Sequence, residues 1–211
     1  MTRRRSEPPV VAAARRAGVG DPRVLEALAA VPREDFLPPE ARGEVDIDHP
    51  VPIGRGQTTS QPSLIAKMLE ALELTGSERV LEVGTGFGYQ AALLAHLAAE
   101  VYTIERFGDL AATARENLAA CGLGEVEVVT GDGTRGLPEH APFDAIIVAA
   151  AAPEVPGPLA EQLADGGRLV APVGPSDQQV VEVYEGRGGQ LTRLKRLVGV
   201  RFVPLVPGEV E

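Results

Sequence analysis

The stretch that decides the fold is Val80-Leu81-Glu82-Val83-Gly84-Thr85-Gly86-Phe87-Gly88-Tyr89. Its first four residues form a short, mostly apolar run that predicts a buried strand, and glycines recur at every second position after it. Glycines at a strand-to-helix turn permit tight backbone angles and the close approach of a ligand, and the next helix offers unpaired amides at its N-terminus. In a parallel sheet such a turn lies at the carboxyl edge, where ligands bind. The stretch therefore predicts a site for a nucleotide-like ligand.

Strand and helix signals alternate around this turn. Apolar runs predict further strands at 101–104, 126–129, 145–148 and 168–171, and helical spacing predicts helices at 64–72, 91–99, 110–120 and 159–163. Strands that alternate with helices indicate a parallel sheet covered on both faces. In residues 178–206 two strand-like runs flank three glycines, which predicts an antiparallel hairpin. We therefore expect a doubly wound, Rossmann-like α/β fold, mostly parallel, with antiparallel strands at its C-terminal end.

The segment before this core has two parts. Residues 8–31 carry apolar side chains at helical spacing, and Asp21 before Pro22 is a typical helix cap followed by a proline at the first helical position. Residues 32–62 are rich in proline and glycine without a periodic apolar run, which predicts a long ordered loop, and such loops are usually functional. We expect residues 1–62, with the helices and an active-site loop, to pack on a core of residues 63–211 as effectively one domain.

Composition excludes several classes of function. The chain of 211 residues has 30 acidic and 20 basic side chains, a formal net charge of −10. Such a surface repels phosphate backbones, which argues against general nucleic-acid binding. The single cysteine, Cys121, forms no internal disulfide and fits a reducing compartment. The histidines at positions 49, 96 and 140 lie far apart in the sequence, so we expect no metal site.

The chain begins with basic residues, Arg3–Arg5, as some export signals do. The apolar run that follows, Val10–Ala14, is short and is interrupted by Arg15, unlike the apolar core of a signal peptide. No stretch approaches the roughly 20 apolar residues of a membrane span. We therefore expect a cytoplasmic protein with no membrane partner and a solvated arginine tail.

The spacing of the glycines narrows the choice of ligand. Dinucleotide sites favour G-x-G-x-x-G, whereas Gly84, Gly86 and Gly88 are one residue tighter and follow closely after Glu82. This form resembles the first motif of S-adenosylmethionine-dependent methyltransferases. A tight turn without a ligand is the alternative interpretation of the glycines alone.

Two acids after later strands extend this pattern. Glu105 follows Gly84 by 21 positions, and an acid about 20 residues on is where ribose hydroxyls are held. Asp132, followed by Gly133, comes after the third strand, and in methyltransferases an acid there commonly meets the adenine amino group. In isolation Glu105 is equally a helix cap and Asp132 a turn residue. Features at three successive strand ends, in order, favour a cofactor site.

The segment Pro52-Ile53-Gly54-Arg55-Gly56-Gln57-Thr58-Thr59-Ser60-Gln61-Pro62 closely resembles the PIGxGQTxSQP signature of protein-L-isoaspartate O-methyltransferases. The resemblance extends over almost the whole chain, through residues 29–36, 81–90, 142–146 and 200–205. It implies the sheet of a class I methyltransferase, with S-adenosyl-L-methionine as cofactor and S-adenosyl-L-homocysteine as its product.

The resemblance also implies a reaction. The family methylates the α-carboxyl group of L-isoaspartyl residues in damaged proteins and peptides, with D-aspartyl residues as a further candidate substrate, and the ester collapses to a succinimide that hydrolyses in part to aspartate. A carboxylate is already ionised at neutral pH, so methyl transfer needs no general base, and orientation and desolvation remain as the enzyme's tasks. A monomer suits an enzyme that must reach sites on many proteins.

The expected site residues follow from these motifs. Ser60 is expected to bond the substrate carboxylate, with capping of the next helix by Ser60 or Ser63 as the structural alternative. The expected cofactor contacts are Glu82, Gly84, Thr85, Gly86, Gly88, Tyr89, Glu105, Asp132 and Gly133. Acceptance of many sequences favours main-chain contacts to the substrate, and the expected ones are Ile53, Gln57, Thr58, Thr59, Ala151 and Val203. Arg55 and Arg201 are the positive charges available to offset the net charge.

Two departures from the family pattern keep alternatives open. Asp46 stands where an aromatic residue is usual, and Thr59 where Ile or Asn is usual. Asp46 is compatible with a family relative dedicated to one peptide or precursor. A nucleotide-binding module without catalysis is opposed by the intact acids and Ser60, and a nicotinamide dehydrogenase by the tight glycine spacing.

Overall fold

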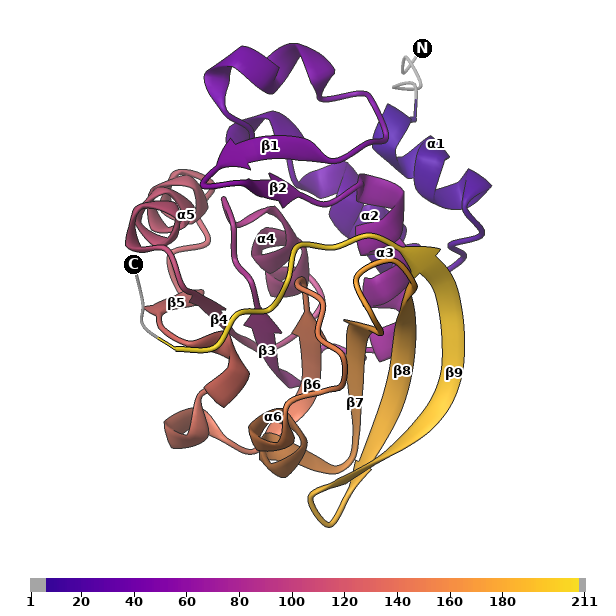
Figure 1. Ribbon diagram of the computed structural model, residues 1–211. Coiled ribbons are helices and arrows are strands. Elements are labelled where there is room, and N and C mark those ends of the chain that lie inside the picture. Colours follow the sequence, from indigo (N-terminus) through magenta and orange to yellow (C-terminus); the bar gives the residue numbers. More distant parts are fainter. Residues whose placement is uncertain (1–6, 209–211) are drawn as a thin grey trace.

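The computed structural model describes residues 7–208 and is built around one seven-stranded sheet (Figure 1). The strand order is β5-β4-β3-β6-β7-β8-β9. Neighbouring strands from β5 to β7 are parallel, and β8 and β9 add to the edge as an antiparallel hairpin. The strands are β3 (Arg79–Val83), β4 (Glu100–Glu105), β5 (Glu127–Thr130), β6 (Phe143–Val148), β7 (Leu163–Val173), β8 (Gln179–Arg187) and β9 (Gln190–Val200). The predicted doubly wound sheet with antiparallel C-terminal strands is confirmed.

Helices cover both faces of the sheet, as the alternation of elements predicts. Along β3, Val80 packs into a cluster shared with the helices of one face, and Leu81 packs into the cluster on the other face. The first cluster takes in α1, α2, α3, α4 and α5, and the second takes in Leu159 of α6. The helices are α1 (Pro9–Arg16), α2 (Pro22–Ala30), α3 (Pro62–Leu72), α4 (Tyr89–Ala95), α5 (Gly108–Ala120) and α6 (Gly157–Gln162).

The N-terminal segment differs in detail from the prediction. Residues 8–31 form two helices, because the chain turns between Ala17 and Asp21. The start of α2 is as predicted: an Asp21 side-chain oxygen accepts a hydrogen bond from the amide of Arg23, and Pro22 is the first helical residue. Helix α4 begins two residues before its predicted start because Gly88, with a φ of 95°, reverses the chain directly before it.

The predicted loop of residues 32–62 contains regular structure. Two 3-10 helices, η1 (Arg33–Phe36) and η2 (Pro39–Glu44), lead to a hairpin of β1 (Val51–Gly54) and β2 (Gln57–Thr59). The hairpin crosses above α4 and α5 (Figure 1). Its strands have only four and three residues, too few to give a period-2 pattern, so sequence reasoning did not find them.

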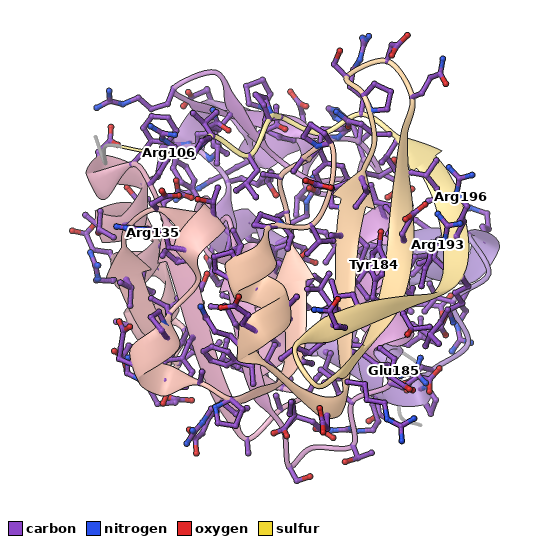
Figure 2. All side chains as sticks on the ribbon, turned by 60° about the horizontal axis from the view of Figure 1, so that its bottom comes forward. Arg106, Arg135, Tyr184, Glu185, Arg193 and Arg196 are labelled. Atoms are coloured by element: carbon purple, nitrogen blue, oxygen red, sulfur yellow. The ribbon has the colours of Figure 1, made fainter. Side chains whose placement is uncertain are left out.

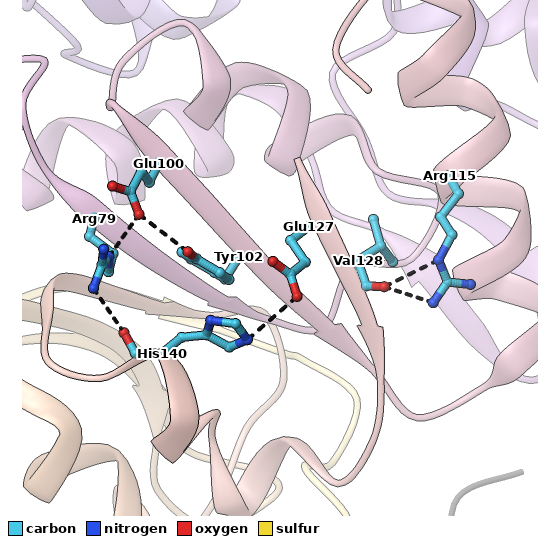
Figure 3. A network of polar contacts seen from close by, with 7 residues as sticks. All are labelled: Arg79, Glu100, Tyr102, Arg115, Glu127, Val128 and His140. Atoms are coloured by element: carbon cyan, nitrogen blue, oxygen red, sulfur yellow. Dashed lines mark hydrogen bonds and ion pairs between the residues drawn. The ribbon is translucent and has the colours of Figure 1, made fainter. Parts of the chain in front are cut away.

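Polar residues join the amino ends of β3, β4 and β5 (Figure 3). Arg79 Nε donates to Glu100 at 2.8 Å, the Tyr102 hydroxyl donates to the same carboxylate at 3.2 Å, and His140 lies 3.4 Å from Glu127. These exposed pairs contribute little to stability. They lie at the amino ends of the parallel strands, whereas the site described next lies at the carboxyl ends.

Among residues 7–208, no helix is long and apolar enough to cross a membrane. The apolar run Val10–Ala14 belongs to α1. The basic residues Arg3–Arg5 lie outside the described part of the chain.

Candidate active site

A cavity of about 260 Å³ opens at the carboxyl ends of β3 and β4, just below the usual size range of small-molecule sites, which begins at about 300 Å³. Four segments form most of its wall: the β1–β2 hairpin, the glycine turn after β3, the end of β4, and the segment that follows β9. Among the residues that line it are Phe36, Ile53, Gln57, Thr58, Thr59, Ser60, Gly84, Thr85, Gly86, Tyr89, Glu105, Phe107, Gly133, Ala149, Val203 and Leu205.

The acid at the end of β4 holds the glycine turn after β3. One oxygen of Glu105 accepts a hydrogen bond from the Gly86 amide at 2.9 Å, and the other accepts from the Phe107 amide at 3.1 Å. The carboxylate is 6% exposed and lines the cavity. Burial raises its pKa, and the amide hydrogen bonds act against that shift. Its remaining lone pairs are acceptors for a ligand with paired hydroxyl groups.

The β1–β2 hairpin covers the glycine turn. A methyl group on Gly86 would lie 3.0 Å from the Ile53 side chain, so hairpin and turn are in close contact. Two residues with positive φ, Arg55 and Gly56, form the tip of the hairpin. Arg55 Nε donates to Asp109 at 3.0 Å, at the start of α5, and its guanidinium lies 5.7 Å from the Phe107 ring centre. The tip is therefore fixed to α5.

The Tyr89 hydroxyl in the cavity wall is buried and has no hydrogen-bond partner among the described residues. Tyr89 lines the cavity and is 3% exposed, and within residues 7–208 nothing accepts from or donates to its hydroxyl. Burying a hydroxyl without a partner is unfavourable. Together with the Glu105 carboxylate, it fits a ligand that brings its own polar groups.

Beneath the glycine turn lies a buried polar chain. The Thr103 hydroxyl donates to Glu82 at 2.6 Å, and the Thr85 and Thr103 hydroxyl oxygens lie 2.6 Å apart. Glu82 is fully buried, and burial raises its pKa to about 8, against the opposing effect of the hydrogen bond from Thr103. Burial therefore favours the protonated form of this carboxyl. Of these residues, only Thr85 reaches the cavity wall.

A second cavity, of about 500 Å³, adjoins the first. Four residues line both: Thr58, Ser60, Ala149 and Val203. Most of the rest of its wall comes from α3 and from residues 198–202, which end β9 and follow it, and Ala17, Pro50 and Gln61 complete it. Ser60 thus stands at the boundary between the two cavities.

The segment that carries Ser60 is fixed by an acid that sequence reasoning did not single out. One oxygen of Asp48 accepts from the Ser63 amide at 2.9 Å, and the other accepts from the Gln61 side chain at 2.9 Å. Asp48 therefore caps α3, and no side-chain cap comes from Ser60 or Ser63. The capping alternative for Ser60 is wrong because Asp48 already occupies that place.

A buried arginine holds the chain before Asp48. Arg33 is 2% exposed, and its guanidinium donates to the carbonyl oxygens of Val45, Ile47 and His49 at 2.8–3.1 Å. Backbone carbonyls thus replace a carboxylate as the partners of this buried charge. Arg33 thus fixes the chain around Asp48, and Asp48 in turn fixes Gln61 and Ser63, on either side of Pro62 and directly after Ser60.

Comparison with known proteins identifies the family. Residues 5–210 match the family model described as protein-L-isoaspartate(D-aspartate) O-methyltransferase. The chain belongs to this family. A protein-L-isoaspartate O-methyltransferase of Methanoregula boonei is 56% identical over 90% of this chain and 87% of its own length. Another, from Methanoculleus marisnigri, is 52% identical over 97% of this chain and 92% of its own.

A solved structure has the same fold. A Plasmodium falciparum protein assigned as a protein-L-isoaspartate O-methyltransferase, in complex with S-adenosyl-L-homocysteine, superposes with a TM-score of 0.84. It is 26% identical, and the match covers 96% of this chain and 99% of that one. The chain is therefore a protein-L-isoaspartate O-methyltransferase by family and by fold. The comparisons do not favour a relative dedicated to one peptide, and Asp46 is exposed and lines neither cavity.

Most residues singled out in the sequence of this family member line the first cavity. They are Ile53, Gln57, Thr58, Thr59, Ser60, Gly84, Thr85, Gly86, Tyr89, Glu105, Gly133 and Val203. Their joint placement brings the signature loop, the glycine turn and the later strand ends to one cavity. Their individual roles toward ligands stay predictions.

Glu82 and Gly88 do not line either cavity. Glu82 is buried beneath the turn, where it supports Thr85 through Thr103. A side chain on Gly88 would meet Leu118 of α5 at 3.3 Å. Both positions therefore support the turn from behind in this structure, and their expected contact with the cofactor stays a prediction.

Asp132 and Ala151 also lie outside both cavity walls. Asp132 accepts hydrogen bonds from the amides of Thr134 and Gly208. The amide and carbonyl of Ala151 are both bonded to the segment after β9, at Val203 and Leu205. In this structure both residues bond to that segment. Their expected contacts with cofactor and substrate stay predictions, and the nearby Ala149 lines both cavities.

Sequence reasoning missed several wall residues. Phe107 and Leu205 are apolar and lie within two residues of positions that were chosen, Glu105 and Val203. Phe36 lies in residues 29–36, which match the family but were given no role. Lys67 of α3 also lines the second cavity. In the sequence it is a lysine among the apolar residues of a predicted helix, and nothing there distinguishes it from a solvent-exposed lysine.

Proposed function

We propose that this protein uses S-adenosyl-L-methionine to methylate the α-carboxyl group of L-isoaspartyl residues in damaged proteins and peptides, with D-aspartyl residues as a further candidate. The position of Ser60 carries the proposal, because it lines both cavities. A transferase needs its two reactants to meet at one point. The family membership and the relatives named for this reaction support the same conclusion.

The first cavity fits the cofactor. Glu105 would hold the ribose hydroxyls through the lone pairs left by its amide hydrogen bonds. The Tyr89 hydroxyl and the glycine turn offer further polar contacts. When bound, S-adenosyl-L-methionine supplies an activated methyl group. The Plasmodium falciparum relative holds the demethylated form of this molecule.

The second cavity fits the isoaspartyl chain. The substrate carboxylate is already ionised, so the residues at the boundary need only to bind, orient and dehydrate it. The Ser60 hydroxyl would donate a hydrogen bond to one carboxylate oxygen and leave the other directed toward the first cavity. Thr58, Ala149 and Val203 complete the boundary around it and limit the access of water.

The proposal includes a monomer that acts in the cytoplasm on isoaspartyl proteins and not on nucleic acid. One copy supplies the walls of both cavities, so the site needs no second chain. The single cysteine fits a reducing compartment. The net charge of −10 opposes contact with nucleic acid.

A pair of peptides tests the proposed function. Purified protein is incubated with methyl-labelled S-adenosyl-L-methionine and either an isoaspartyl peptide or its aspartyl twin of the same sequence. We expect base-labile label on the isoaspartyl peptide alone. Equal labelling of both, or of neither, would refute the proposal. Several unrelated isoaspartyl sequences should all be accepted, and acceptance of one alone would favour the dedicated enzyme.

A further inference from the structure

The second cavity has a charge pattern opposite to that of the whole chain. Lys67 of α3 and Arg201, just after β9, both line it. No Asp or Glu is among the residues of the described chain that line it. In a protein of net charge −10, a cavity whose charged lining residues are both cations differs from the average surface.

The carboxylates that share a hollow with Lys67 already have hydrogen-bond or ion-pair partners. A neighbouring hollow that Lys67 also borders contains Asp21, Glu70 and Glu73. Glu70 accepts hydrogen bonds from two backbone amides that precede α2, Asp21 caps that helix, and Glu73 pairs with Arg168. Lys67 forms no ion pair with any residue in the range 7–208. Its charge is therefore available to the cavity.

Arg201 is similarly available. It is exposed, and although Asp177 borders the same shallow hollow, the two form no ion pair. Arg193 and Arg196, which both lie on β9 (Figure 2), differ. Each lies 3.1 Å from the buried carboxylate of Glu182. Glu182 thus partly neutralises the charges of Arg193 and Arg196, whereas Arg201, beside the cavity, has no such ion pair with a described residue.

Both cations lie close to the boundary where Ser60 stands. Lys67 follows Ser63 by one turn on the same face of α3, about 6 Å along the helix, and Ser63 also lines the second cavity. Arg201 precedes Val203, which lines both cavities, by about 7 Å of extended chain. An extended peptide advances about 3.5 Å per residue. The cations thus lie within reach of side chains one or two positions from the reacting residue.

We propose that Lys67 and Arg201 select isoaspartyl residues that have an Asp or Glu within two positions. This inference rests on the proposed function and specifies its substrate class. The net charge repels an acidic peptide from the protein as a whole, and two unpaired cations at the cavity reverse that effect locally. The enzyme would then methylate acidic damaged segments that its overall charge disfavours.

Matched peptides test this. Each carries one isoaspartate in the same sequence, with either Glu or Gln at the flanking positions, and kcat/KM is measured for both. An exposed ion pair changes an equilibrium constant by about two- to fivefold. We therefore expect the kcat/KM of wild type to be about two- to fivefold higher for the Glu peptide than for the Gln peptide. The preference should shrink as salt rises from about 0.05 to 0.5 M, because screening weakens exposed pairs.

Variants assign the preference to the two residues. In Lys67→Gln with Arg201→Gln, the ratio of Glu to Gln peptide should fall to one or below. Arg187→Gln removes the same charge at the far end of β8, about 26 Å along the strand from Gln179, and should keep the wild-type ratio. The far position exceeds the screening length at physiological salt.

The outcomes separate this inference from the proposed function. Methylation of both peptides without charge preference, or a preference that survives in the double variant, overturns the inference and leaves the function standing. An equal loss of kcat/KM on both peptides in the double variant would mean that the cations hold the reacting carboxylate, and that also overturns it. No methylation of any isoaspartyl peptide would refute the function and the inference together.

Discussion

The Gly86 amide donates a hydrogen bond of 2.9 Å to the Glu105 carboxylate. This contact joins the turn after β3 to the end of β4, two segments separated by 19 positions in the chain. The same carboxylate lines the first cavity. One set of its lone pairs therefore fixes the glycine turn, and the other set is what the proposed function assigns to the cofactor.

Replacement of this acid should weaken cofactor binding. In Glu105→Gln the amide group turns one nitrogen toward either the Gly86 or the Phe107 amide, so one hydrogen bond is lost, together with the negative charge. Hydrogen bonds to charged groups contribute about 1.5–3 kcal/mol each, so we expect the Kd for S-adenosyl-L-homocysteine to rise about 10- to 100-fold by calorimetry. Glu100→Gln, at the exposed other end of β4, is the control. An unchanged Kd in Glu105→Gln would contradict the assignment.

Ser60→Ala should separate catalysis from cofactor binding. If the hydroxyl orients the substrate carboxylate, its loss costs a charge-assisted hydrogen bond, and we expect kcat/KM for an isoaspartyl peptide to fall about 10- to 100-fold. Binding of S-adenosyl-L-homocysteine should stay near the wild-type value. The exposed Ser77→Ala serves as the control. Loss of cofactor binding in Ser60→Ala would instead make Ser60 a structural or cofactor residue.

Asp48→Ala should destabilise the fold. The side chain caps α3 through the Ser63 amide and holds Gln61, and removal of such a cap costs about 1 kcal/mol. We expect a loss of this size in the free energy of unfolding from denaturant titration. Asp46→Ala changes an exposed acid two residues earlier and should have almost no effect. Equal stabilities of the two variants would show that Asp48 is not a cap.

Glu82→Gln should change how stability depends on pH. Below about pH 4.5 the carboxyl is protonated in both the folded and the unfolded chain. Between about 4.5 and 8 the unfolded chain releases this proton and the folded chain keeps it, so the contribution of Glu82 to stability declines as the pH rises. The decline is at most about 1.4 kcal/mol per pH unit.

The glutamine variant carries no titrating proton at this position. We expect its stability relative to wild type to increase between pH 5 and pH 8, measured by chemical unfolding at several pH values. Glu185→Gln replaces an exposed acid on β8 and should follow the wild-type curve. A constant difference between Glu82→Gln and wild type would show that Glu82 is ionised in the folded protein.

Local patterns in the sequence determined the sheet and the contents of the first cavity. Short apolar runs marked the strands, and residues directly after parallel strands meet at one edge whatever the details of packing. For this reason Gly84 and Glu105 could be placed at one site before the structure was known. The signature of residues 52–62, which contains Ser60, indicated the family because its order of residues is specific.

Only the tertiary structure decided which of these residues line the cavity and which support it from behind. Glu82 and Gly88 proved to support the turn from behind, and Asp132 to hold the chain after β9, because hydrogen bonds and packing partners 20 to 80 positions away took up their groups. Nothing local marks Asp48 as the cap of α3 or Lys67 as a cavity cation. A motif places a residue at a strand end, but the packing of distant segments determines whether its side chain lines the cavity or bonds to other parts of the chain.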